Sequence, residues 1–163
     1  VGKTSSSIRP ACAISPARPI WIDAVYLLDT NVVSELRRPD KAASAVLAWS
    51  RAAVADQLFI SSITVFEIEL GVRQKERRDA TQGRLLRQWL EMQVLPQFQG
   101  RVLDVDIAVA RRCAALHSPD PAPERDAWIA ATALVHHMTV VSRNTRDFLA
   151  CGAQVFNPWL APD

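Results

Sequence analysis

Short runs of apolar residues alternate along this chain with longer stretches whose apolar positions recur at helical spacing. The runs are typical of buried strands, and they lie at 25–29, 58–61, 102–105, 139–142 and 154–156. The helical stretches between them cover 30–38, 41–55, 61 or 62 to about 78, 80–95, 104 or 106 to 117, 124–137 and 145–150. This alternation predicts an α/β fold, with a central, mainly parallel sheet of four to five strands flanked by helices.

Two polar residues directly follow strands of this predicted sheet. Asp29 ends the first apolar run, and Asn144 comes shortly after the fourth. Binding and catalytic sites of open parallel sheets form just beyond the carboxyl ends of the strands. We therefore expect Asp29 and Asn144 to belong to one site.

The composition is that of one globular domain. The chain has 163 residues, of which 49% are apolar and 22% charged, and its formal net charge is +2. No run approaches the roughly 18 apolar residues of a membrane span. Its three cysteines show no paired spacing, which indicates a reduced, cytoplasmic protein without a disulfide or zinc framework.

The small positive charge comes from the first part of the chain. Residues 25–163 carry equal numbers of basic and acidic side chains, so the excess lies within residues 1–24. That segment is rich in Pro, Ser and Ala and lacks the apolar run of a secretory signal. We expect residues 1–24 to form a flexible extension and residues 25–163 to form the domain.

One glutamate stands out on the predicted helix that ends near residue 78. On a helical wheel Glu67 lies beside Ile63 and Leu70, on an apolar arc where an unpaired carboxylate is costly. Glu69 falls on the opposite side, where it can pair with Arg73. Glu67 therefore either binds a metal ion or forms a buried pair with an arginine.

The aspartates have both structural and chemical interpretations. Asp29 can cap a helix, Asp126 can stabilise a helix N-terminus, and Asp147 is ambiguous for the same reason. Asp126, however, shares a face with Ile129 and Ala133 and so points toward the core. Three or four acids in one cleft repel each other, and a hard divalent cation, Mg²⁺ or Mn²⁺, relieves that repulsion. Such a site suits phosphodiester hydrolysis.

Four segments resemble the PIN-domain family, and in particular its VapC-type toxins, the ribonucleases of type II toxin–antitoxin pairs. The segments are LLDTNVVSEL (27–36), ISSITVFEIELGV (60–72), ERDAWIAATAL (124–134) and VVSRNTRDF (140–148). They occur in the family's order and spacing, and the likeness covers about residues 25–160. The resemblance implies a small, metal-dependent α/β endoribonuclease, usually a homodimer, with RNA as its substrate and a cognate antitoxin as its partner.

The resemblance also assigns roles to individual positions. Asp29, Glu67 and Asp126 match the family's metal-site acids, with Mg²⁺ as the expected ion and Mn²⁺ as an alternative. The fourth position is Asn144, which carries no charge, and Asp147 would compensate for it. The implied catalytic set is therefore Asp29, Glu67, Asp126, Asn144 and Asp147.

Neighbouring polar and basic residues are candidates for orienting these groups or binding RNA. Thr30 and Asn31 match the polar pair after the first acid, and Arg143 and Arg146 flank the expected site. The basic stretch from Arg73 to Arg87 is either a solvated helix face or an RNA contact. Arginine suits phosphate recognition because its guanidinium binds two oxygens at once.

Two other functions remain open from the sequence. A non-catalytic PIN-like module that binds RNA or a partner is the first, because Asn144 brings no charge to the site. A phosphatase with Asp29 as nucleophile is the second. Such enzymes usually carry another Asp two residues later, and position 31 is Asn, so we rank this function last.

Overall fold

Five short strands form the central sheet of the structure, a computed structural model that describes residues 24–160. Residues 1–23 and 161–163 lie outside the described residues, as does almost all of the predicted N-terminal extension. The strands are β1 (Tyr26–Leu28), β2 (Leu58–Ser61), β3 (Val102–Leu103), β4 (Thr139–Val141) and β5 (Val155–Phe156). They follow the order β3-β2-β1-β4-β5, and each neighbouring pair is parallel. The predicted parallel sheet is confirmed.

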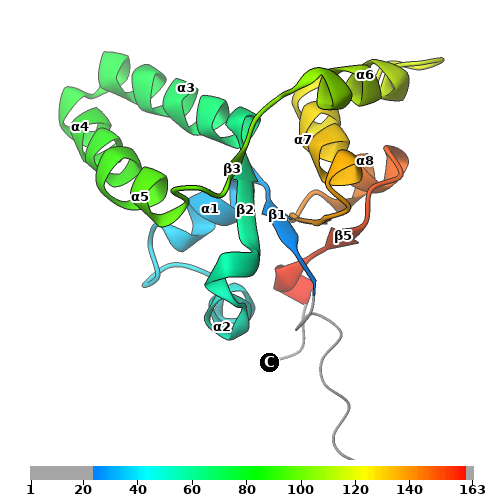
Figure 1. Cartoon of the computed structure of the whole chain (residues 1–163). Helices are drawn as coiled ribbons and strands as arrows, with labels where there is room; N and C mark the ends of the chain where they lie inside the picture. Colours follow the sequence, from blue (N-terminus) through cyan, green and yellow to red (C-terminus); the bar gives the residue numbers. More distant parts are fainter. Residues whose placement is uncertain (1–23, 161–163) are drawn as a thin grey trace, which may run out of the picture.

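Helices cover both faces of this sheet (Figure 1). They are α1 (Thr30–Leu36), α2 (Ser44–Ala52), α3 (Ser62–Arg78), α4 (Ala80–Trp89), α5 (Leu95–Gln97), α6 (Ile107–Leu116), α7 (Glu124–Val135) and α8 (Thr145–Ala150). The single helix predicted over 80–95 is α4 continued by a π-helical turn, η2 (Leu90–Val94), into α5. Two 3₁₀ turns, η1 (Ala55–Gln57) and η3 (Pro158–Leu160), complete the described chain.

Strand β1 contributes residues to two hydrophobic cores, one on each face of the sheet. Leu27 packs with Ile129, Val140 and Phe148 in the core between the sheet and the helices α7 and α8. Leu28 points to the other core, which α1, α3 and η2 help to close. Successive strand residues face opposite sides of a sheet, so this short buried strand holds both layers together. It thereby fixes the position of Asp29, the next residue.

Side-chain caps set the starts of the helices α3 and α6. Ser61 caps α3, its hydroxyl accepting a hydrogen bond from the Thr64 amide at 3.1 Å. Asp106 caps α6 in the same way, with its carboxylate 2.8 Å from the Val109 amide. Of the alternatives left open by the sequence, Ser61 and Asp106 are therefore the caps.

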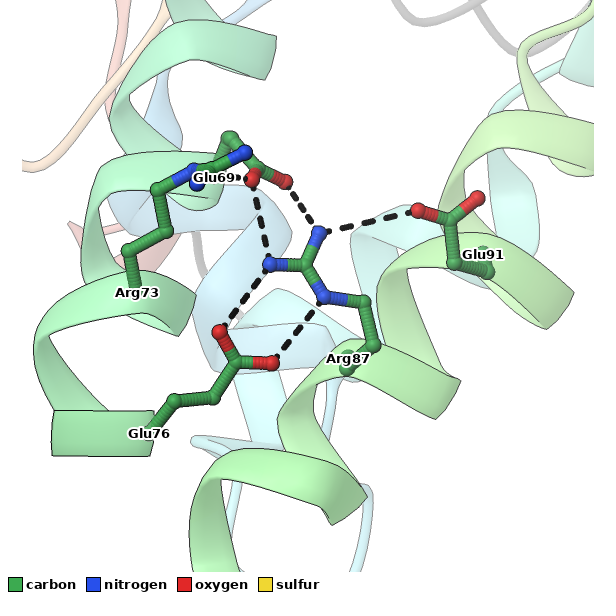
Figure 2. A network of polar contacts seen from close by, with 5 residues as sticks. All are labelled: Glu69, Arg73, Glu76, Arg87 and Glu91. Atoms are coloured by element: carbon green, nitrogen blue, oxygen red, sulfur yellow. Dashed lines mark hydrogen bonds and ion pairs between the residues drawn. The ribbon is translucent and has the colours of Figure 1, made fainter. Parts of the chain in front are cut away.

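Helices α3 and α4 form an antiparallel pair that is tied together by charges (Figure 2). Arg87 of α4 forms ion pairs with Glu69 at 2.5 Å, Glu76 at 3.2 Å and Glu91 at 3.7 Å. Glu69 also pairs with Arg73 at 2.6 Å, as predicted. In the basic stretch from Arg73 to Arg87, both end residues are therefore engaged with acids, which favours the helix-surface interpretation over RNA contact for these two arginines.

Within residues 24–160, no helix combines the length and the apolar character that crossing a membrane would require. This agrees with the absence of a long apolar run in the sequence.

Candidate functional site

A polar cleft lies at the carboxyl ends of β1 and β4. It is lined by residues from β1–α1, α3, α7 and the segment after β4, namely Asp29, Thr30, Asn31, Ser34, Glu67, Arg125, Asp126 and Asn144. The structure thus brings together six of the residues that the sequence singled out. The other three, Arg143, Arg146 and Asp147, do not line the cleft.

Asp29 is the most buried acid of the cleft, with 6% of its surface exposed. One carboxylate oxygen accepts from the Thr30 amide at 2.7 Å, which makes Asp29 the cap of α1. The other accepts from the Asn31 side-chain amide and the Ser142 hydroxyl, each at 2.6 Å. Both interpretations of Asp29 therefore apply, because it caps a helix and also lines the cleft.

Burial raises the pKa of Asp29 from 3.8 to about 6. The hydrogen bonds from Ser142 and Thr30 act in the opposite direction, since they stabilise the charged form. The nearby charges of Asp126 and Glu67 act in the same direction as burial and contribute less to this raised pKa. The neighbouring acids therefore add to the cost of ionising Asp29, and a bound cation would relieve that repulsion.

Glu67 lies on the inner side of α3, with 17% of its side chain exposed. One of its oxygens accepts a short hydrogen bond from the Thr30 hydroxyl. Its other oxygen lies 3.5 Å from the guanidinium of Arg125. The inward position agrees with the helical wheel, and the arginine pair left open by the sequence is present as well. That pair is weak because more than half of the Arg125 side chain is in solvent.

Asn144 connects two acids at the end of β4. Its side-chain amide donates to Asp126 at 3.0 Å and to Asp147 at 2.8 Å. Burial is the main cause of the raised pKa of Asp126, and the charges of Asp147 and Glu67 add to it. Asp147 therefore affects the cleft in two ways: it accepts a hydrogen bond from Asn144, and its charge raises the pKa of Asp126.

Ser142 is a site residue that our sequence reasoning missed. It is fully buried, and its hydroxyl donates to Asp29 while accepting from the Asn31 side chain and the Asn144 backbone amide, both at 2.9 Å. The signal was available, because Ser142 follows β4 directly as Asp29 follows β1. Leu28 and Val141 are paired in register, which places the next residues side by side.

Among the arginines near the cleft, the residue that lines it is Arg125, which sequence reasoning did not select. It directly precedes Asp126, and that adjacency was the available signal. Arg143 instead lays its guanidinium 5.1 Å from the centre of the Trp159 ring, while its backbone amide donates to Asn31 at 3.3 Å. Arg146 is exposed on α8.

The cleft offers oxygen donors for a hard cation but no closed cage. Asp29, Glu67 and Asp126 supply carboxylates, the ligands that Mg²⁺ prefers. Over residues 24–160, no three acidic, histidine or cysteine side chains are arranged closely enough to hold a metal ion between them. Mg²⁺ usually keeps several of its waters and uses only one or two carboxylates, so the donor set fits a hydrated ion.

Comparison with known proteins gives consistent results. A sequence profile of the PIN domain matches residues 26–152. The chain is 40% identical over 141 residues to Toxin FitB of Neisseria gonorrhoeae, an alignment that covers 83% of this chain and 99% of that protein. It is 39% identical over 145 residues to VapC ribonuclease Y4jK of Sinorhizobium fredii, with 83% and 98% covered.

Solved structures resemble this fold closely. The crystal structure of FitAcB from Neisseria gonorrhoeae superposes with a TM-score of 0.77 at 37% identity, covering 84% of this chain and all of that one. The structure of FitAB bound to an IR36 DNA fragment gives a TM-score of 0.73 at 36% identity, with 85% and 99% covered.

Proposed function

Because this chain belongs to the PIN domain family, we propose that it is a metal-dependent endoribonuclease and the toxin of a toxin–antitoxin pair. The observation that carries this proposal is the convergence of Asp29, Glu67 and Asp126, from three separate elements, on one cleft. Its relatives include a protein named as a toxin and another named as a VapC ribonuclease. The reaction would be hydrolysis of RNA phosphodiester bonds.

The proposed cofactor is Mg²⁺, with Mn²⁺ as an alternative. Asp29, Glu67 and Asp126 would hold it, directly or through its waters. The ion would supply an activated water and neutralise charge on the phosphate. The raised pKa values of Asp29 and Asp126 support this choice, because both carboxyls are destabilised in their charged forms when no cation is present.

Residues around the acids would position them for this chemistry. Asn31 and Ser142 donate to the same oxygen of Asp29 and so fix the direction of its carboxylate. Thr30 holds Glu67 through its hydroxyl. Asn144 holds Asp126 and links it to Asp147. Because hydrogen bonds hold all three acids before any ligand arrives, little reorganisation is needed at the moment of reaction.

The proposed partner is a cognate antitoxin that lays a segment with an arginine across the acidic cleft. The two solved structures that resemble this chain carry the compound names FitAcB and FitAB, which supports a protein partner for this chain. A groove of about 330 Å³ with a mixed polar and apolar lining lies on the other side of α1, with Val33, Leu36 and Trp89 among its lining residues. Since α1 borders both the groove and the cleft, one partner segment could fill the groove and reach the acids.

The proposal is completed by a homodimer, which the family likeness implies, and by a cytoplasmic location, which the cysteine spacing indicates. Light scattering of the purified protein tests the first. Expression with and without the proposed cognate antitoxin tests the toxin role, since growth should stop without the antitoxin and recover with it. A partner that binds the chain but fails to restore growth would contradict that role.

Cleavage of single-stranded RNA tests the nuclease proposal. The purified protein, freed of antitoxin, should cleave RNA in Mg²⁺ and stop when EDTA is added. Cleavage that persists in EDTA would contradict the metal requirement.

A non-catalytic RNA- or partner-binding module is the second candidate. The neutral side chain of Asn144 favours it, because an Asn at this position gives the cleft one carboxylate fewer. RNA binding without Mg²⁺-dependent turnover, across several RNAs, would support this candidate over the first.

A further inference from the structure

A second hollow opens directly beside the acidic cleft. It measures about 310 Å³, lies between α3 and α7, and is lined by Ile63, Phe66, Glu124, Arg125 and Trp128. We call it the α3–α7 hollow. Its volume is at the lower end of the range for small-molecule sites, which begins near 300 Å³. It is large enough for one small planar group.

The α3–α7 hollow is continuous with the cleft because the same two helices build both. Helix α3 supplies Glu67 to the cleft and Phe66 to the hollow. Helix α7 supplies Asp126 to the cleft and Trp128 to the hollow. Arg125 lines both and forms the border between them. An RNA chain that places a phosphate at the acids can therefore place a neighbouring base in this hollow.

Some apolar residues of the lining pack against a hydrophobic core, and one is exposed to solvent. Ile63 packs against the core between the sheet and α7, and Trp128 packs against the core between α6 and α7. Phe66 is 52% exposed, so its ring is accessible to a ligand in the hollow. The Arg125 guanidinium lies 5.7 Å from the centre of its ring. The hollow thus presents two aromatic side chains with a cation beside them.

We propose that the α3–α7 hollow binds one unpaired nucleobase of the RNA, adjacent to the phosphate that the cleft receives. This inference rests on the proposed nuclease function and names a base subsite for it. Proteins bind the bases of single-stranded RNA by stacking them on aromatic rings and arginine planes. Phe66 and Trp128 are the stacking surfaces here.

Arg125 provides the link between the base and the phosphate. Without RNA it faces Glu67 at 3.5 Å and packs on Phe66. A phosphate at the border offers it two oxygens in place of one distant carboxylate oxygen, which is the stronger interaction. Arg125 then leaves Glu67, and that carboxylate becomes available to a cation.

A set of abasic oligonucleotides tests this base subsite. A short single-stranded RNA is prepared intact and as a series in which one base at a time is removed. Binding is measured by fluorescence anisotropy in EDTA, where no cleavage occurs. The wild-type protein should lose about tenfold in affinity at one position of the series, the amount expected for one stacked base.

Variants of Phe66 identify the residue responsible. Phe66→Ala should bind the intact RNA about tenfold more weakly and should no longer respond to removal of the sensitive base. Phe66→Tyr keeps an aromatic ring and should behave as wild type. Leu85→Ala removes a comparably exposed apolar side chain, 55% exposed on α4, and should change nothing. Circular dichroism checks that each variant folds.

Each remaining outcome refutes one proposal in particular. Equal affinity for all members of the abasic series, or an equal loss in Leu85→Ala, would overturn the base subsite. A Phe66→Ala protein that changes from dimer to monomer in light scattering would make the hollow a subunit contact, and also overturn it. A protein that shows the base dependence but never cleaves RNA in Mg²⁺ would refute the nuclease proposal alone.

Discussion

The side-chain amide of Asn144 donates a hydrogen bond to Asp126 at 3.0 Å, joining the end of β4 to α7. The same amide donates to Asp147 at 2.8 Å, so a neutral group stands between two carboxylates. An amide nitrogen cannot bind a cation, and in this orientation it holds the acid that can. We infer that Asn144 positions Asp126 and that Asp147 positions Asn144.

Two substitutions of Asn144 test separately its hydrogen bonds to Asp126 and Asp147 and its lack of charge. Asn144→Ala removes both hydrogen bonds and should lower Mg²⁺-dependent RNA cleavage by about 10- to 100-fold, the usual effect of losing a residue that orients a metal ligand. Asn144→Asp should lower the Mg²⁺ concentration needed for half-maximal cleavage, because it adds a third negative charge beside Asp126 and Asp147. Cleavage rates in a Mg²⁺ titration test both. An Asn144→Ala protein with the wild-type titration would show that the amide does not position Asp126.

Removing the Ser142 hydroxyl should shift the pH dependence of cleavage. In Ser142→Ala, Asp29 loses a hydrogen bond that lowers its pKa, so that pKa should rise above about 6. The rising limb of the pH–rate profile should then move to higher pH, because Asp29 must be ionised to attract a cation. Ser50→Ala, which removes a hydroxyl that donates to the Leu47 carbonyl, is the control. Identical profiles for the two variants would contradict this role.

The stability of the metal-free protein should fall as the pH rises from about 4 to about 6. Asp29 has a pKa of about 6 in the folded protein against an ordinary 3.8, so the folded state binds the proton more tightly across this interval. The unfolded state therefore gains as the proton is released, by at most about 3 kcal/mol at 1.36 kcal/mol per pH unit. Urea unfolding in EDTA at several pH values measures the effect.

Asp29→Asn and Mg²⁺ supply the matching controls for that pH dependence. The variant cannot titrate at this position and should lack Asp29's contribution to the decline. Mg²⁺ added near neutral pH should stabilise the wild type, because it binds the folded state, and should stabilise Asp29→Asn less. A wild type and a variant with the same pH dependence would rule out Asp29 as its source.

Two glycines in the α3–α4 pair should respond oppositely to alanine. A Cβ at Gly83 would clash with the backbone of Glu76, so Gly83→Ala should destabilise the protein by about 1–3 kcal/mol through forced separation of the helices. A Cβ at Gly71 meets nothing within 4 Å, so Gly71→Ala should be neutral or stabilise by up to about 1 kcal/mol. Thermal unfolding of both variants measures these changes in stability. Equal effects would show that the helices do not pack closely at Gly83.

Sequence patterns predicted much of this architecture because they report local chemistry. The apolar run ending at Asp29 is a buried strand, and the position of Glu67 on an apolar arc is an inward-facing carboxylate. Both follow from periodicity within a single element. The order of the strands could not be predicted from these patterns, since it depends on which runs pair across the sheet.

Features that depend on contacts between elements escaped this reasoning. Ser142 becomes a partner of Asp29 only when β1 and β4 pair in register. The sequence left open whether Arg87 contacts RNA or lies on a helix surface, because its ion pairs with Glu69 and Glu76 form only when α4 packs against α3. Arg125 gains its place at the border of the cleft from the contact between α3 and α7. The pattern within a single segment does not predict such contacts between separate elements.

The most direct test is Mg²⁺-dependent RNA cleavage by the wild type and by Asp126→Asn. Asp126→Asn removes one carboxylate charge from the cleft, while Asp120→Asn, in the exposed loop before α7, is the matched control. Wild type and Asp120→Asn should cleave in Mg²⁺ and not in EDTA, and Asp126→Asn should be slower by about 100-fold or more. An Asp126→Asn protein that cleaves RNA as fast as the wild type would contradict the proposed metal-dependent site.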